Sequence, residues 1–235
     1  MAFFLLLVAA GDWFARGNEA YEAGQFAQAV TLYDSAAAVP GRAEVYFNRG
    51  NAWFKQGKVG KAIADYLRAW ALSPHDPDIR YNLEFSRRFR PDRNATRPNP
   101  LVDTATRMLR FLPAPFVAIG AGLMFLLAAA GMAVMSVSGR RAAGWLALGA
   151  GMLFVYCLAA QASWASATSP ARVVVIVPEL VLRAGPGAEY KEIVIVHDGM
   201  EATARERRPG WVLIQVPGGE GGWVEDGTVE QIFGG

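Results

Sequence analysis

The sequence predicts a multidomain protein with three parts: an all-α array of helical repeats, a two-helix transmembrane hairpin and a small all-β barrel. Near the N-terminus, aromatic residues, Gly and Ala recur at a fixed offset of 33 residues. Two later stretches carry no charged residue, and each exceeds the roughly 20 residues that a helix needs to cross a bilayer. From Arg172 onward, short runs rich in β-branched residues alternate with Gly and Pro, which is typical of a small barrel.

The first ten residues, MAFFLLLVAA, form an apolar segment without the basic start that is usual in an export signal. As a helix they reach about 15 Å, which is too short to span a bilayer. Val8 and Ala10 fit the small-residue rule of signal peptidase, with cleavage before Gly11. We therefore expect residues 1–10 to be a signal-like segment. The alternative is a short apolar helix that packs against the first repeat.

Residues 11–90 are predicted to hold two helix–turn–helix repeats and a capping helix that begins near Asp76–Asp78 and ends at Pro91. The Ala and Tyr residues of each repeat fall at helical spacing and form one buried stripe. The matched pairs, all 33 residues apart, are Trp13 with Tyr46, Gly17 with Gly50, Gly24 with Gly57, Phe26 with Val59, Ala29 with Ala62, Tyr33 with Tyr66, and Ala36 with Ala69.

This pattern, with Pro40 and Pro74 near the ends of the two copies, resembles the tetratricopeptide repeat. The resemblance implies a concave face, built by the first helix of each repeat, that binds an extended or helical peptide. The residues expected to line this groove are Phe14, Asn18, Tyr21, Glu22, Phe47, Asn48, Asn51, Phe54 and Lys55.

Peptide-clamping members of that family grip a ligand backbone with Asn amides, at the places held here by Asn18 and Asn48. An amide suits this task because it both donates and accepts hydrogen bonds. Phe14 stands where such members carry a lysine for a terminal carboxylate, so we expect a more apolar ligand. The alternative is that Asn18 and Asn51 are ordinary structural residues of the repeat.

Residues 91–110 are rich in Pro and Arg and are predicted to be a linker. The two predicted spans, 111–139 and 142–168, are joined by a turn that contains Arg140 and Arg141. A hairpin this tight places its two flanking domains on the same side of a membrane, whatever its orientation. The single cysteine, Cys157, lies in the second span and cannot form an intrachain disulfide.

The positive-inside rule does not choose the orientation of the hairpin. Arg140 and Arg141 favour a cytoplasmic turn and external domains, whereas Arg107, Arg110 and Arg172 favour the opposite.

Residues 172–235 contain three motifs in order: Leu182-Arg183-Ala184-Gly185-Pro186-Gly187, Gly210-Trp211 and Gly222-Trp223-Val224. This order resembles the bacterial SH3-like domain, although Val181 replaces the Asn common before the Arg turn. The resemblance implies a ligand surface on which Tyr190 and Trp211 are the candidate residues, while Trp223 is expected in the core. Secreted relatives often recognise peptidoglycan peptides, and the same fold is also used for protein contacts.

Enzymatic function is not predicted. His75 and His197 lie in different domains, and the sequence shows no metal-ligand spacing, no nucleophile with a base, and no phosphate-binding glycine loop. We therefore expect no catalytic residue, no metal and no cofactor. Residues 172–235 carry six basic and ten acidic side chains, which is a poor match for the phosphates of nucleic acid.

The complete arrangement resembles the BatE-type proteins of bacterial aerotolerance (Bat) operons. The resemblance implies a non-enzymatic scaffold in the bacterial inner membrane, with both soluble domains in the periplasm. Its implied partners are von Willebrand factor A-domain Bat proteins and a MoxR-type ATPase, in envelope or oxidative stress tolerance. The alternatives are a peptidoglycan-binding cell-wall sensor or attachment factor, and an assembly chaperone with many transient clients.

Overall fold

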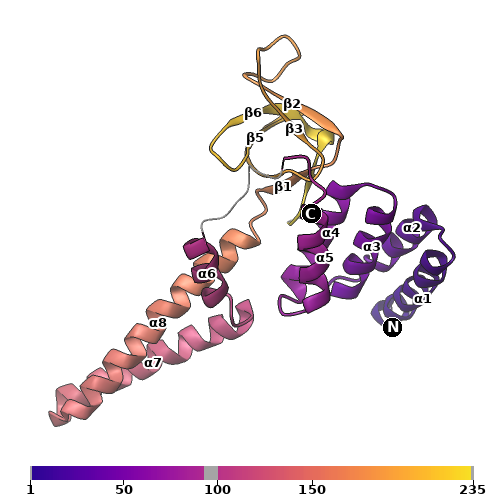
Figure 1. Ribbon diagram of the computed structural model, residues 1–235. Coiled ribbons are helices and arrows are strands. Elements are labelled where there is room, and N and C mark those ends of the chain that lie inside the picture. The colour runs from indigo at the N-terminus through magenta and orange to yellow at the C-terminus, as the bar shows by residue number, and fades with distance from the viewer. Residues whose placement is uncertain (1, 93–99, 234–235) are drawn as a thin grey trace. The chain divides into compact units, whose positions relative to one another are not determined.

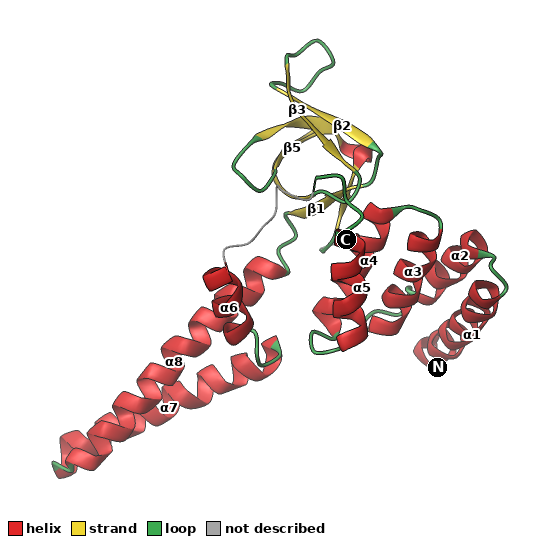
Figure 2. Cartoon of the chain, viewed as in Figure 1, coloured by secondary structure: helices red, strands yellow, loops and turns green. Residues whose placement is uncertain are grey.

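The structure is a computed structural model that describes residues 2–92 and 100–233, and the chain forms two compact units (Figure 1). The first unit combines Met1–Arg97 with Pro170–Gly235 and holds the helical repeats and the barrel. The second unit is Pro98–Ser169 and holds the apolar helices. The three predicted structural classes are all present, which confirms the predicted fold class (Figure 2).

Five helices form the repeat array, and each packs against the next in chain order. They are α1 (Ala2–Glu22), α2 (Phe26–Ala36), α3 (Ala43–Lys55), α4 (Val59–Leu72) and α5 (Pro77–Arg87). Helix α1 runs without a break through most of the apolar segment at residues 1–10 and into the first repeat. Export and cleavage of that segment therefore stay a prediction.

The 33-residue pairing reflects one packing arrangement used twice. The predicted buried stripes are at most 2% exposed, namely Ala29, Tyr33 and Ala36 in α2 and Ala62, Tyr66 and Ala69 in α4. A Cβ added at Gly17 would lie 2.6 Å from Cε1 of Tyr33, and one at Gly50 would lie 2.8 Å from Cε1 of Tyr66. Both glycines are therefore needed because a tyrosine ring lies directly against the helix backbone.

Helix α5 begins where the sequence predicts. The Asp76 carboxylate accepts hydrogen bonds from the backbone N–H groups of Asp78 and Ile79, and Pro77 occupies the first turn. This arrangement satisfies amide groups that otherwise have no partner at a helix start. The helix ends at Arg87, and its buried residues Ile79 and Leu83 face the repeats.

The C-terminal domain is one seven-stranded antiparallel sheet in the order β3-β2-β6-β5-β4-β1-β7. Its strands are β1 (Arg172–Val175), β2 (Glu179–Arg183), β3 (Glu192–His197), β4 (Glu201–Arg208), β5 (Trp211–Gln215), β6 (Gly221–Glu225) and β7 (Val229–Gln231). A short 3-10 turn, Asp226–Thr228, precedes β7. Alternate residues such as Leu182, Val212 and Ile214 are fully buried, and Trp223 is 7% exposed, as expected for a core residue.

The repeats and the barrel share part of their cores within the first unit. Val174 of β1 and Ile232, just beyond β7, belong to the same buried cluster as Ile63 and Leu67 of α4. Phe233 is packed against this cluster. The sequence predicts the repeats and the barrel as separate domains, and the structure shows that they share part of a core.

The second unit holds α6 (Pro100–Leu109), α7 (Ala114–Ser138) and α8 (Arg141–Ala167). The predicted linker 91–110 is therefore wrong over residues 100–109, which form a helix. Three polar contacts hold α6 and the following turn to α8: Trp164 Nε1 donates to the Leu112 carbonyl, Arg110 donates to Ser163, and the Tyr156 hydroxyl donates to the Met108 carbonyl.

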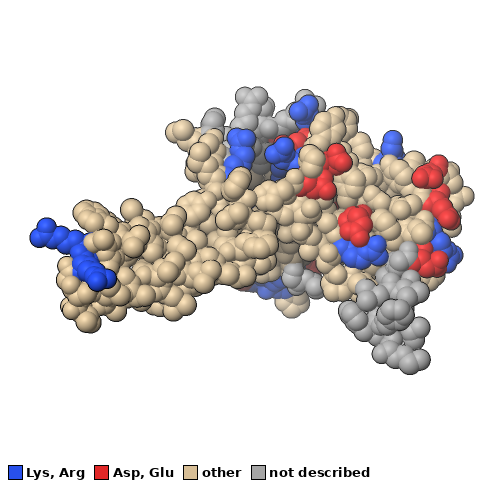
Figure 3. Space-filling view, turned by 90° about the horizontal axis from the view of Figure 1, so that it is seen from below, with Lys and Arg blue, Asp and Glu red and all other residues tan. Residues whose placement is uncertain are grey.

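Helices α7 and α8 are long and apolar enough to cross a membrane, with mean hydropathies of 2.2 and 1.8. Gly139 ends α7 in the left-handed conformation, and Arg140 and Arg141 follow at the turn. Figure 3 shows the hairpin as a largely uncharged surface with basic side chains at its tip. Large apolar side chains, Leu above all, are exposed along both helices, as expected of helices that face lipid.

Candidate binding groove

A hydrogen-bonded triad joins the first three helices at the centre of the predicted groove. Oδ1 of Asn18 in α1 accepts from the hydroxyl of Tyr33 in α2 at 2.8 Å and from Nδ2 of Asn48 in α3 at 2.9 Å. Burial, followed by the nearby Tyr21, raises the pKa of Tyr33 to about 12. Tyr33 therefore stays protonated at neutral pH and remains a donor to Asn18.

The same triad recurs one repeat later. Oδ1 of Asn51 in α3 accepts from the hydroxyl of Tyr66 in α4 at 2.7 Å and from Nδ2 of Asn82 in α5 at 2.9 Å. Asn18 and Asn51 thus have a structural role, which is the alternative that the sequence left open. Within the described part of the chain, the Nδ2 of Asn18 makes no hydrogen bond, so this amide keeps a donor for a ligand.

A pocket of about 280 Å³ opens over the first triad. It is lined by Asn18, Tyr21, Glu22, Tyr33, Asn48 and Asn51, and we call it the amide pocket. Five of these six residues belong to the predicted groove set, so the structure brings them together as expected. Tyr33, the sixth, is a buried-stripe residue whose hydroxyl reaches the pocket from α2. The lining is polar and its only charged side chain is Glu22.

The remaining predicted groove residues lie elsewhere. Phe14 and Phe47 pack on Tyr33 and Tyr66, with ring centroids 5.9 and 6.0 Å apart, and are half-buried. Phe54 packs against two rings that follow it in the chain, and Lys55 is exposed. Their binding role stays a prediction.

The groove prediction omits three aromatic residues of α5 and of the turn just after it, because it gives this helix a capping role. Tyr81, Phe85 and Phe89 are 66%, 36% and 54% exposed. A further step of 34 residues from Phe47, Asn51 and Lys55 leads to these three positions. The signal was available, because the Asn48–Asn82 spacing extends the repeat pattern into α5.

The candidate residues on the barrel come from different elements, since Tyr190 lies between β2 and β3 and Trp211 begins β5. The ring of Tyr190 is 44% exposed and covers Gly185, where a side chain would overlap it. Trp211 is half-buried in β5 and lies opposite Glu225 of β6. Trp223 carries the Arg208 guanidinium over its ring at 4.7 Å.

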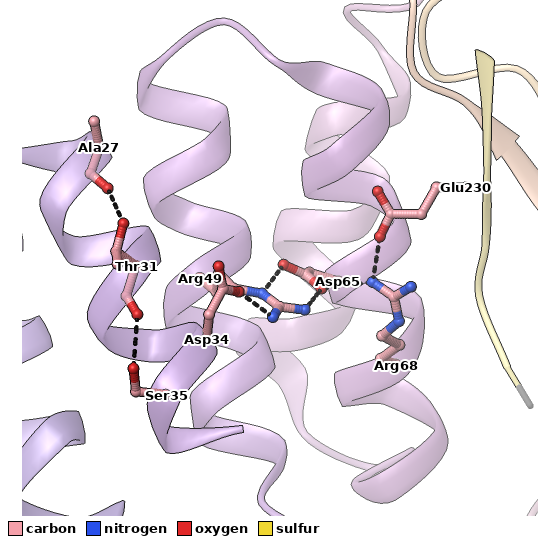
Figure 4. A network of polar contacts seen from close by, with 8 residues as sticks. All are labelled: Ala27, Thr31, Asp34, Ser35, Arg49, Asp65, Arg68 and Glu230. Carbon is pink, nitrogen blue, oxygen red and sulfur yellow. Dashed lines mark hydrogen bonds and ion pairs between the residues drawn. The ribbon is translucent and has the colours of Figure 1, made fainter. Parts of the chain in front are cut away.

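A polar network ties the repeats to the barrel (Figure 4). Asp65 of α4 is 1% exposed and accepts from Arg49 at 2.5 and 2.7 Å and from Arg68 at 2.9 Å. Arg68 extends the network across to the barrel, donating to Glu230 at 2.7 Å and to the carbonyl oxygens of Gln231 and Ile232. A buried carboxylate with this many donors is fully compensated.

A second ionic cluster surrounds Glu201 of β4. Arg87 of α5 and Arg172 of β1 each donate to it at 2.8 Å, and Arg90 approaches at 3.4 Å. Burial alone would raise the pKa of Glu201, but the charges and hydrogen bonds of Arg87, with Arg172 and Arg90, lower it to about 2. This carboxylate is therefore ionised at neutral pH and fixes α5 to the barrel.

In the described ranges, 2–92 and 100–233, no three His, Cys, Asp or Glu side chains are grouped to hold a metal ion. His197 contacts Asp92 through hydrogen bonding: its backbone N–H donates to Oδ2 of Asp92 at 2.8 Å, and its Nδ1 lies 3.0 Å from Oδ1.

The structure defines a class of protein built from a helical repeat array, a small barrel and an apolar helical hairpin. Residues 14–77 match the family model of the tetratricopeptide repeat, and residues 177–231 match that of the bacterial SH3 domain. The two matches agree with the repeat array and barrel of the first unit. A search of curated proteins found no match to the chain.

Proposed function

We propose that this chain is a non-enzymatic, membrane-anchored scaffold that binds protein partners through its repeat groove and its SH3-like domain. The observation that carries the proposal is the amide pocket, an open polar cavity on the face where this repeat family holds peptides. The barrel supplies a second surface around Tyr190. Because the two modules share a core, they present both surfaces in a fixed arrangement, which favours simultaneous binding.

The anchor in this proposal is the α7–α8 hairpin, which has the length and composition of two membrane spans. Both binding modules then lie on one side of the membrane, and we place them in the periplasm of a bacterial inner-membrane protein. The resemblance to BatE-type proteins supports a place beside von Willebrand factor A-domain proteins and a MoxR-type ATPase, in envelope or oxidative stress tolerance.

A cell-wall role is the second candidate function, and the bacterial SH3 match of residues 177–231 favours it. In this case the barrel binds peptidoglycan through the surface around Tyr190, and the repeats connect the wall to other proteins.

Photo-crosslinking in living cells tests the scaffold function. A photoreactive residue at Lys55 lies in the predicted groove, whereas one at Gln28 lies on an exposed position of α2 outside it. We expect discrete crosslinked products from position 55 that are absent from position 28. Equal patterns at both positions, or none at either, contradict a partner in the groove.

Sedimentation with purified peptidoglycan tests the cell-wall function. The full chain in detergent is the right material, because an isolated barrel would expose Val174 and Ile232 of the shared core. Co-sedimentation that is lost in Tyr190→Ala supports the cell-wall function, and no co-sedimentation of the parent chain contradicts it.

Fusions after Gly235 test the orientation. Alkaline phosphatase activity supports periplasmic modules, whereas fluorescence from a protein that matures only in the cytosol contradicts them and excludes peptidoglycan as a ligand.

A further inference from the structure

The groove continues beyond the amide pocket onto α5, and its chemistry changes there. The first triad lies at an open, polar pocket, whereas phenylalanines replace polar or tyrosine residues at equivalent positions one repeat later. Phe54 replaces Tyr21, and Phe85 and Phe89 replace Asn51 and Lys55. We call Phe54, Tyr81, Phe85 and Phe89 the aromatic ladder.

The rings of the ladder contact one another in a continuous series. Tyr81 stacks on Phe85 with centroids 6.0 Å apart, and Phe85 meets Phe89 edge to face at 5.0 Å. Phe54 closes the series from α3, at 5.7 Å from Phe85 and 5.3 Å from Phe89. These contacts hold the rings in place without burying them, since Tyr81 and Phe89 remain more than half exposed.

Exposed aromatic residues in an ordered cluster are typical of a binding surface, because large rigid rings bury much area and lose little entropy. A capping helix that only ended the repeat array would present a polar outer face instead. The ladder therefore has the properties of an apolar binding surface.

Basic residues adjoin two rings of the ladder in the chain: Lys55 follows Phe54, and Arg88 precedes Phe89. Lys55 in α3 and Arg88 just after α5 are both exposed, and within the described residues neither forms an ion pair. The nearby acid Glu84 is neutralised by Arg87 at 2.7 Å. By contrast, the charged residue of the amide pocket is the acidic Glu22. The two parts of the groove thus differ in charge as well as in polarity.

We propose that the aromatic ladder binds a partner protein segment that carries aromatic or aliphatic side chains next to Asp or Glu residues. The apolar side chains of the segment pack on Tyr81, Phe85 and Phe89, and its carboxylates lie near Lys55 and Arg88. The amide pocket holds an adjoining polar part of the same segment. This inference rests on the proposed function, since it names the kind of partner that the groove takes.

Continuity with the amide pocket favours a protein segment over a lipid surface. Phe54 and Phe85 of the ladder hold the helix positions of Tyr21 and Asn51 of the pocket, one repeat further on, so one extended or helical segment can contact both parts of the groove. A bilayer surface would use the aromatic and basic residues of α5 and would leave the pocket empty. A ligand that contacts both the amide pocket and the aromatic ladder is therefore a protein segment, whereas one that contacts the ladder alone is a bilayer surface.

Selection from a random 12-residue peptide library displayed on phage tests the inference, with the full chain held in lipid nanodiscs. Recovered peptides are then synthesised and measured by fluorescence anisotropy. We expect them to be enriched in Phe, Trp or Leu together with Asp and Glu. The Phe85→Ser/Phe89→Ser variant should weaken their binding by about tenfold or more, as expected for aromatic anchor residues. The Lys55→Glu/Arg88→Glu variant should weaken acidic peptides and spare neutral ones.

Matched variants distinguish a failure of groove binding from a failure of the inference about the aromatic ladder. Glu22→Lys alters the amide pocket, and Gln28→Lys, as a control, places the same lysine side chain on exposed α2 outside the groove. One contrary result is that recovered peptides lose affinity for the Glu22→Lys variant and yet are basic, or bind the ladder variants as tightly as the parent chain. Either result overturns the ladder inference and leaves binding in the groove intact. Recovery of no peptide sensitive to either set of variants overturns both. Thermal melting of each variant identifies any loss of binding that comes from unfolding.

A lipid occupant has its own readout. A fluorophore attached at Phe89→Cys, in a chain that also carries Cys157→Ser, is mixed into nanodiscs whose lipids bear nitroxide headgroups. Weak quenching that matches a label at Gln28→Cys supports a protein segment. Strong quenching at position 89 alone overturns the proposal in favour of a membrane contact.

Discussion

The backbone N–H of Gly60, in the first turn of α4, donates a hydrogen bond of 3.0 Å to Oδ1 of Asp198 in the turn between β3 and β4. Lys58, at the N-cap position of α4, supplies no side-chain cap of its own. A residue of the barrel, 138 positions later in the chain, therefore caps a helix of the repeats. The barrel helps to stabilise α4 in addition to presenting a surface of its own.

Gly60→Ala should loosen the repeats from the barrel. A Cβ at this position would overlap both the carbonyl oxygen of Val175 and Oδ1 of Asp198. Because one partner is backbone, relief requires the two modules to move apart, at about 1–3 kcal/mol for an overpacked contact. Hydrogen exchange of the full chain in detergent should show faster exchange in both α4 and β1. Gly227→Ala, where an added Cβ has no neighbour within 4 Å, is the control.

Glu201→Gln should destabilise the same interface through charge. Its carboxylate is 13% exposed and faces Arg87, Arg90 and Arg172, so the variant leaves three partly buried guanidinium groups without their shared counter-ion. Removal of one partner from a buried ionic cluster costs about 3–5 kcal/mol. We expect a lower melting temperature and faster proteolysis of the segments where α5 contacts the barrel. Glu206→Gln is the control, because its partner Arg208 is exposed; equal effects of the two changes would contradict the argument.

The stability of the first unit should fall at acidic pH with a contribution from Glu201. Its pKa is about 2 in the folded chain and 4.5 for an ordinary glutamate, so the folded state binds the proton more weakly than the unfolded state. The stabilisation is complete above about pH 4.5 and is lost as the pH falls toward 2; it amounts to about 3 kcal/mol. The melting temperature should therefore fall less steeply between pH 7 and pH 2 for Glu201→Gln than for the parent chain.

The fold could be predicted from the sequence because its signals are local and periodic. The spacing of Gly17 and Tyr33 repeats in Gly50 and Tyr66, and the absence of charge defines α7 and α8. The shared core could not be predicted in this way. Val174 reads as an ordinary strand residue, and nothing local distinguishes a barrel core position from one that meets Ile63 of α4.

The candidate groove was only partly predictable for a related reason. The sequence predicts that Asn18 and Asn48 grip a ligand, but Oδ1 of Asn18 already accepts hydrogen bonds from Tyr33 and Asn48. A sequence shows that an amide is present without showing which of its atoms is used. The repeat pattern lacks a complete third copy after Pro74, so the sequence predicts a cap, and not a groove, around Tyr81, Phe85 and Phe89.

Oδ1 of Asn18 accepts two hydrogen bonds, so the energetic effects of changing Asn18 and Tyr33 should be coupled. Asn18→Ala leaves the Tyr33 hydroxyl and the Asn48 amide without their acceptor, which should cost about 1–3 kcal/mol because Tyr33 is 1% exposed. Tyr33→Phe removes the donor together with its need for a partner, so its cost should be smaller. In urea unfolding of the full chain, the double variant Asn18→Ala/Tyr33→Phe should be less destabilised than the two single changes added together. The equivalent pair, Asn51→Ala and Tyr66→Phe, should behave in the same way because the second triad has the same geometry. Strictly additive effects at both triads would contradict a shared acceptor and would indicate that each asparagine acts through packing alone.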